Sequence, residues 1–272
     1  EIADAHSVDE ILEKQVRLPR LIKNMINSGA KSRIVTRLIS SITDEILKKL
    51  IVFAIDTLGP PPADFAFIVM GSEGRMEQTL KTDQDNAIVY ADPNPKDLHA
   101  VNEYFLKLGS TVCTWLDRVG FTFCKGDVMA QNPIWCQPLS KWKQYFHTWI
   151  RVSTAKDLLK STIFFDFRLG YGNADMVDDL RLYLFEALSG WSRFFRDLTV
   201  NSMRLRPPIG FFRNFVLESK GEHRNKLDMK KAMTPIVDAA RIYALHENIA
   251  ETNTQERIYQ LHLKKVFNTR TY

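Results

Sequence analysis

The sequence predicts an α+β protein, with a small mixed sheet in the middle of the chain, helices before it and an all-helical region after it. Three observations predict this class. Helical spacing fills the first sixty residues, two short apolar runs follow at 65–70 and 85–90, and helical patterns dominate from Ser140 onward. We therefore expect three parts: an N-terminal helical region at 1–60, a sheet core at 61–138 and a helical domain at 139–272.

The N-terminal part shows two helical patterns. In the first, ILEKQVRLPRLIKNMINSG, apolar residues recur on one face from Ile11 to Met25, with a kink expected at Pro19 and a stop at Gly29. The second runs from Ser32 to about Leu58. The three prolines that follow it cannot continue a helix, so this part ends there.

The central part reads as strands around one helix. FAFIVM (65–70) and DNAIVY (85–90) are short continuous apolar runs, which favours strands buried on both faces. Helical spacing then covers 97–119 and ends before Gly120, and FTFCKG (121–126) is a candidate third strand. After Ser140 we expect only helices, at about 139–150, 154–169, 175–198, 209–219, 229–250 and 254–267.

The composition is that of an ordinary globular protein. Of the 272 residues, 45% are hydrophobic and 25% are charged, which excludes a disordered chain. The formal net charge of +5 is compatible with an anionic partner such as a nucleotide, but it is too small to indicate nucleic-acid binding by itself.

Nothing in the sequence indicates a membrane or secreted protein. No stretch reaches the length of a transmembrane helix, and the first residues, EIADAHSVDE, are too acidic and polar for a signal peptide. Cys113, Cys124 and Cys136 lack paired C-x-x-C spacing, so neither a disulfide framework nor a zinc site is expected. The chain starts without Met, and we expect a cytoplasmic protein that is a piece of something longer.

Two acidic residues stand at the mouth of the second apolar run. Side chains alternate along a strand, so Asp83 and Asp85 point to one face and Gln84 to the other. Two carboxylates on one face repel each other, and a divalent cation between them removes that cost. We therefore expect Asp83 and Asp85 to bind Mg²⁺, with two ions for phosphoryl transfer and Mn²⁺ as an alternative. A polar turn that caps the strand is the other interpretation.

The residues after the first run are suited to phosphate. Gly71 lets backbone N–H groups approach an anion, and the segment EGRMEQTL is expected to start a helix, whose N-terminus favours phosphate. Ser72 can donate its hydroxyl, and Arg75 can either contact a triphosphate or form an ion pair with Glu77 or Asp83.

The polar residues that flank the two acids are also candidates. We count Thr82 and Asn86 with the nucleotide-binding residues, because they can orient the carboxylates. The alternative is that they are polar residues at a strand end.

The pattern of Gly-Ser, ten residues, then Asp-x-Asp before a strand resembles the signature of the DNA polymerase β-type nucleotidyltransferase superfamily. The longer segment GSEGRMEQTLKTDQDNAIVY is similar to a bacterial branch related to the PII-protein uridylyltransferases. That branch is often fused to CBS or cyclic-nucleotide-binding modules, which we accordingly expect in a longer parent chain. KGDVMAQNPIW, FFDFR and LDMKKAMTPIVDAARIYAL extend the resemblance from about residue 10 to residue 267.

The resemblance implies that 61–138 is a nucleotidyltransferase core and 139–272 a substrate-binding domain. It also implies roles for particular residues. Gly71 and Ser72 would bind the nucleotide phosphates, and Asp83 and Asp85 the metals. A third carboxylate usually completes such a site, and Asp127, at the end of FTFCKG, is the candidate for this catalytic and metal-binding role; an ordinary Gly-Asp turn is the alternative.

Charged residues within the apolar segment FFDFR also need an explanation. For Asp166 and Arg168 we favour structural ion pairs over a role in the nucleotide cleft.

Two functions remain open at this point. The first is a metal-dependent enzyme of regulatory, signal-transduction type that moves a nucleoside monophosphate from an NTP to an acceptor hydroxyl. The acceptor would be a Tyr of a small regulatory protein, a small molecule or an RNA end. The second is a catalytically inactive module that senses a nucleotide or binds a protein.

Overall fold

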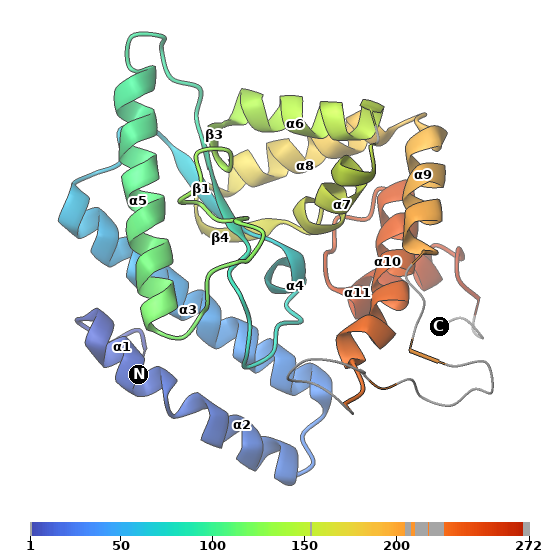
Figure 1. The fold of residues 1–272 in the computed structure, drawn as a ribbon, viewed down its shortest axis with the longest axis horizontal. Helices are drawn as coiled ribbons and strands as arrows, with labels where there is room; N and C mark the ends of the chain where they lie inside the picture. Colours follow the sequence, from blue (N-terminus) through green and yellow to red (C-terminus); the bar gives the residue numbers. More distant parts are fainter. Residues whose placement is uncertain (1, 153, 205–207, 210–216, 218–225, 269–272) are drawn as a thin grey trace. The chain divides into compact units, whose positions relative to one another are not determined.

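A four-stranded mixed sheet confirms the predicted α+β class (Figure 1). The strand order is β3-β2-β1-β4, and β1 lies antiparallel to both β2 and β4, whereas β2 is parallel to β3. The strands are β1 (Phe65–Val69), β2 (Asn86–Tyr90), β3 (Cys136–Pro138) and β4 (Arg168–Gly172). This computed structural model describes residues 2–152, 154–204, 208–209, 217 and 226–268.

Helices make up most of the remaining described residues. They are α1 (Val8–Gln15), α2 (Leu18–Asn27), α3 (Ser32–Leu58), α4 (Gly71–Gly74), α5 (Leu98–Arg118), α6 (Leu139–Val152), α7 (Ala155–Phe164), α8 (Ala174–Leu188), α9 (Ser192–Ser202), α10 (Met229–His246) and α11 (Thr254–Leu263). None of the helices in the described part of the chain is long and apolar enough to cross a membrane.

The chain divides into two compact units. The first comprises 1–145 and 163–183 and contains the whole sheet, whereas the second comprises 146–162 and 184–272. In the second unit α10 packs against α9 and α11, and a small apolar cluster of Ala244, Ile249 and Leu261 joins α10 to α11.

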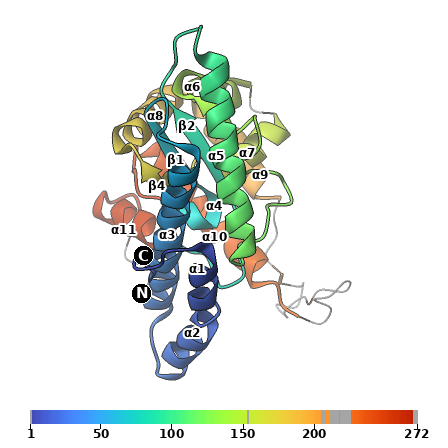
Figure 2. The same ribbon diagram turned by 90° about the vertical axis from the view of Figure 1, so that its left-hand side faces the viewer.

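The core of the first unit lies between the sheet and two long helices. Every residue of β1 and β2 is buried, which confirms that both strands are covered on both faces. Phe65, Phe67 and Val69 of β1 pack in one cluster with α3 and α5, and Figure 2 shows these two helices passing over the sheet. β1 and β2 are therefore stable as strands because their side chains alternate between two apolar layers.

The N-terminal helices follow the predicted pattern with one change. A single kinked helix was expected up to Gly29, but the chain forms two helices, and Pro19 lies in the first turn of α2. Pro is tolerated there because the N–H groups of that turn have no partner within the helix. Leu18 and Ile22 of α2 pack on Val35 and Ile39 of α3.

The prediction of a strand at 121–126 is wrong. Only Thr122 makes an isolated bridge, to Asp83, and the chain then closes a tight turn in which the Asp127 N–H donates to the Cys124 carbonyl (3.0 Å). Asp127 has a φ of +54°, which ends any extended segment. The third strand is β3, ten residues further on.

The region after Ser140 is mostly helical as predicted, but one strand within it was not expected. The helix expected at 154–169 ends at Phe164, and the chain continues as β4, which pairs with β1 from Val69↔Arg168 to Ala66↔Gly172. The sheet unit therefore takes up 163–183, beyond the border expected at residue 138.

Two other helices expected after Ser140 differ from the expectation or fall outside the described residues. The helix expected at 175–198 is divided into α8 and α9 around Gly190, whose φ is +70°. The helix expected at 209–219 lies outside the described residues, apart from two positions.

Candidate active site

The two acidic residues lie directly before β2, in an extended segment with alternating side chains. Gln84 and Asn86 are both buried, with 2% and 1% of their surface exposed, and the Gln84 amide donates to the Cys113 and Phe121 carbonyls at 3.0 and 2.8 Å. Asp83 and Asp85 are half-buried and, by the alternation, face the other way. β1 and β2 are neighbours as predicted, although β2 begins at Asn86 rather than before the acids.

The carboxylate of Asp85 lies against the backbone of Gly71. A Cβ atom added to Gly71 would be only 2.7 Å from Asp85 Oδ2, and Gly71 has a φ of +58°. The Met70 N–H also donates to the Asp85 carbonyl (2.8 Å), which fixes the end of β1 beside this residue. The Gly-Ser element and the second acid of the Asp-x-Asp element are therefore in direct contact.

The phosphate-binding turn predicted at Gly71–Ser72 forms a single helical turn, α4. The Gly74 and Arg75 N–H groups donate to the carbonyls of Met70 and Gly71 at 2.9 and 3.1 Å. The helix expected over EGRMEQTL does not form, because the positive φ of Met76 (+55°) ends α4 after one turn. The half-buried Ser72 hydroxyl has no hydrogen-bond partner among the described residues, so it can still donate to a ligand.

Arg75 is occupied by two carboxylates. Its Nε donates to Glu77 and its Nη1 donates to Asp166, both at 2.8 Å, and 13% of its side chain is exposed. Of the two alternatives for Arg75, the structure therefore shows the ion pair with Glu77. Asp166 is fully buried, and its ion pair with Arg75 confirms the structural ion pair expected for this residue of FFDFR.

The structure does not place Asp127 in a group with the other two acids. Asp127 is exposed, and its carboxylate accepts from the side chain of Asn132 (2.8 Å) within its own loop. In the part of the chain that the structure describes, no group of three or more His, Cys, Asp or Glu side chains could hold a metal ion. The structure shows the Gly-Asp turn that the sequence offered as the alternative for Asp127.

The two flanking polar residues differ. The Thr82 hydroxyl is half-buried and donates to the Asp83 carbonyl (3.2 Å), so Thr82 lies beside the acids. Asn86 points into the interior, where its Oδ1 accepts from the Ala130 N–H (2.8 Å). We leave Asn86 out of the ligand-binding residues, because this side chain joins β2 to the 128–130 segment.

Glu73 is a neighbour of the site that the sequence did not suggest. Its side chain is almost completely buried, and this burial raises its pKa to about 8; the positive charge of Arg168 opposes the shift, while Asp44 and Asp85 add to it. The sequence signal was present, since Glu73 directly follows Gly-Ser. Periodicity could not identify it because α4 has only four residues.

Cys124 is the other neighbour that the sequence did not suggest. Burial raises the pKa of its thiol, and a hydrogen bond and electrostatic contact with Asp85 add to the shift. The thiol is therefore held in its protonated form, which can donate to Asp85.

Asp83 and Asp85 fit a hydrated magnesium ion that is shared with a ligand. Mg²⁺ is commonly held by one or two carboxylates together with water and substrate phosphate oxygens. The Asp83 carboxylate forms neither an ion pair nor a hydrogen bond with any described residue, so its oxygens can bind a ligand.

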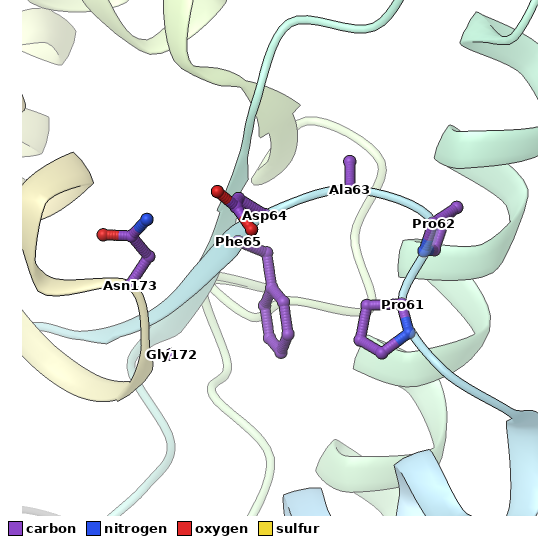
Figure 3. A pocket seen from close by; sticks show the side chains of 7 residues that line it. All are labelled: Pro61, Pro62, Ala63, Asp64, Phe65, Gly172 and Asn173. Atoms are coloured by element: carbon purple, nitrogen blue, oxygen red, sulfur yellow. The ribbon is translucent and has the colours of Figure 1, made fainter.

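Two pockets lie at the opposite end of the sheet. One, of about 470 Å³, surrounds the start of β1, and Figure 3 shows the Phe65 ring between Asn173 and the Pro61–Pro62 segment. The other, of about 770 Å³, lies beside Tyr90 at the end of β2. Neither pocket includes Gly71, Asp83 or Asp85.

Comparison with family models identifies the chain. Residues 16–156 match the family described as Putative nucleotidyltransferase DUF294, and residues 192–272 match the Putative nucleotidyltransferase substrate binding domain. The first match alone covers more than half of the chain. The chain belongs to this nucleotidyltransferase family. A comparison with curated proteins finds no match.

The family assignment confirms the predicted resemblance. The nucleotidyltransferase match contains every predicted site residue, from Gly71 to Asp127. The substrate-binding match begins at α9, beyond the sheet. The segment with Asp166, Arg168 and β4 lies between the two matches.

We expect Gly71→Ala to disturb the nucleotidyltransferase site. The Ala side chain would have to displace the Asp85 carboxylate, and the positive φ adds strain, so the free energy of unfolding should fall by about 1–3 kcal/mol. Urea unfolding measures this loss. Gly29→Ala is the control, since Gly29 also has a positive φ (+80°) but nothing lies within 4 Å of the added Cβ. An equal loss in both variants would contradict the close contact with Asp85.

We expect Glu73 to make the stability depend on pH. The native carboxyl keeps its proton to about pH 8, whereas the unfolded one releases it near pH 4.5. Between these values the unfolded state binds fewer protons, so the free energy of unfolding falls as pH rises, by about 5 kcal/mol in total.

The matched variant is Glu73→Gln, which stays neutral at every pH. Urea unfolding at pH 5, 7 and 9 should show similar stability of the two proteins at pH 5 and a growing advantage of the variant above it. Parallel pH curves would show that Glu73 ionises normally.

Proposed function

We propose that the chain transfers a nucleoside monophosphate from an NTP to an acceptor hydroxyl and releases pyrophosphate. One observation carries the proposal: a half-buried Asp83, with no ion pair to any described residue, stands two residues from Asp85, whose carboxylate touches the Gly71 backbone. A phosphate turn and two acids side by side are what a metal-bound triphosphate requires.

The residues have distinct parts in the proposed reaction. The acceptor oxygen forms a bond to the α-phosphorus, the bond from this phosphorus to the bridging oxygen breaks, and pyrophosphate leaves with the electron pair. The hydroxyl proton passes to a carboxylate or to water. Backbone N–H groups at Gly71 and the Ser72 hydroxyl would hold the phosphates, and Asp83 and Asp85 would hold Mg²⁺ or Mn²⁺.

The bound cation would supply positive charge to the triphosphate oxygens as charge moves onto pyrophosphate. Glu77 and Asp166 are poor candidates for taking the acceptor proton, since both are paired with Arg75. The acceptor would be bound by the domain at 192–272, and a protein hydroxyl, a small molecule and an RNA end all fit the chemistry.

Incubation with each of the four α-labelled NTPs, Mg²⁺ and a cell lysate tests the proposal. Transfer of label to an acceptor, together with pyrophosphate release, would support it. Pyrophosphate release separates transfer from the second candidate function, a nucleotide sensor without turnover. That candidate is favoured by the lack of a three-carboxylate group among the described residues.

We expect Asp83→Asn and Asp85→Asn each to lower transfer by ~100-fold or more, because each removes a metal ligand. The melting temperature without metal should hold or rise, since like-charge repulsion is relieved. Asp64→Asn is the control, as Asp64 precedes β1 at the other end of the sheet. Unchanged transfer in the Asp83 variant would refute the metal site.

We expect Asp127→Asn to leave transfer within about twofold of the wild type, as for other surface substitutions. Asn tolerates the positive φ at this position and can still accept from Asn132, so the turn survives. A large loss of transfer with intact Mg²⁺-NTP binding would instead restore Asp127 as the third carboxylate.

A further inference from the structure

The turn at Gly71–Gly74 is held from outside by an arginine at the start of β4. Arg168 Nε donates to the Glu73 carbonyl at 3.1 Å. The other two guanidinium nitrogens, Nη1 and Nη2, donate to the two carboxylate oxygens of Asp44 in α3, at 3.1 and 2.8 Å. One planar group therefore connects three elements: the turn, β4 and α3.

Strand pairing explains how Arg168 reaches the turn. In the antiparallel register of β1 and β4, Arg168 lies opposite Val69, two residues before Gly71. The side chain thus starts at the end of the sheet where the turn begins. Nη1 also donates to the Leu169 carbonyl (3.3 Å), which restricts the guanidinium further.

The turn also packs directly on the segment before β4. A Cβ atom added to Gly74 would lie 1.7 Å from the Asp166 carbonyl oxygen, a distance that no side chain can occupy. The ion pair between Arg75 and Asp166 joins the same two segments a second time. The turn therefore packs against residues 166–168.

Arg168 contributes orientation rather than net charge. Its partner Asp44 neutralises it, and the two side chains are only 14% and 20% exposed. Arg presents its donors in a rigid fork, so the ion pair with Asp44 fixes the direction of the Nε–H toward the turn. Lys has no equivalent second donor group, because its charge is a single ammonium.

We propose that Arg168 is a positioning residue for the phosphate-binding turn, oriented by Asp44. This inference rests on the proposed function, since it assumes that the Gly71–Ser72 turn binds the NTP phosphates. A turn held at Glu73 and Gly74 keeps its N–H groups and the Ser72 hydroxyl in one arrangement before the nucleotide arrives, which lowers the cost of ordering them on binding.

Two measurements on the whole chain test the proposal. Amide hydrogen exchange of the peptide 71–77, without nucleotide, reports how firmly the turn is held. Calorimetric titration with Mg²⁺-ATP, and in parallel with Mg²⁺-UTP, Mg²⁺-GTP and Mg²⁺-CTP, reports phosphate binding. In Arg168→Lys we expect exchange about tenfold faster and affinity about tenfold weaker, since a hydrogen bond from a charged donor is lost.

The matched control is Lys143→Met. It breaks an ion pair of the same unit, with Asp179 at 2.7 Å, that does not touch the turn. Neither exchange at 71–77 nor nucleotide affinity should change in this variant.

A charge swap separates positioning from general stability. Asp44→Arg combined with Arg168→Asp can restore the ion pair between α3 and β4, but not the donor to the Glu73 carbonyl. We expect the melting temperature to recover relative to Arg168→Asp alone, while exchange at 71–77 stays fast. Recovery of slow exchange in the swap would show a purely structural ion pair and would overturn the proposal.

The outcomes also separate this proposal from the proposed function. Unchanged exchange in Arg168→Lys overturns the positioning role, whatever the nucleotide result. Fast exchange with unchanged affinity, in a wild type that binds nucleotide, overturns it as well. A wild type that binds none of the four nucleotides defeats the proposed function and with it the phosphate role of the turn, even if exchange shows that Arg168 holds it.

Discussion

The buried amide of Gln84 is the interaction on which the candidate site depends. By donating to carbonyls of α5 and the following loop, it adds a side-chain anchor to an extended segment whose backbone is held by the bridge at Asp83 and by the Gln84 N–H donating to the Thr122 carbonyl. Because Gln84 is committed to the interior, its neighbours Asp83 and Asp85 must face the other side. The like-charge repulsion between them is thus imposed by the fold, and it persists because Gln84 and Asn86 would lose their buried hydrogen bonds if the segment turned over.

Sequence periodicity predicted the helices and strands whose packing produces an apolar pattern in neighbouring residues. FAFIVM and AIVY are uniformly apolar because both faces are covered, and α3 and α5 carry a continuous apolar face. β4 escaped prediction for the opposite reason: RLGYG has two glycines and is an edge strand, so its pairing with β1, about a hundred residues earlier, leaves little local trace. β3 has only three residues and includes Pro138, which is acceptable only because it ends the strand at the other edge.

Some residues of the candidate site could likewise be predicted from local sequence and others could not. Gly71, Ser72, Asp83 and Asp85 were predictable because their chemistry follows from spacing within a 15-residue segment, and the close approach of Gly71 to Asp85 agrees with it. The partners of Arg75 and Glu73 were not, since Asp166 and Arg168 lie 91 and 95 residues away along the chain. Whether an arginine meets a phosphate or a carboxylate is decided by such distant contacts, which residue type alone does not reveal.

The distribution of charge around the turn has a consequence for how an anion could bind. Arg75 is shared by Glu77 and Asp166, and Arg168 is held by Asp44, so both arginines beside the turn are already neutralised by carboxylates. Asp83 and Asp85 then leave the site with net negative charge, which repels a triphosphate. Backbone N–H groups and one hydroxyl would not offset that repulsion, whereas a divalent cation on the two acids would cancel their charge. Nucleotide and cation should therefore bind interdependently, each raising the affinity for the other by the same factor, as linkage requires. A site built on unpaired arginines would bind nucleotide without metal. In the proposed site, where carboxylates pair with both arginines beside the turn, the metal would be part of the recognition.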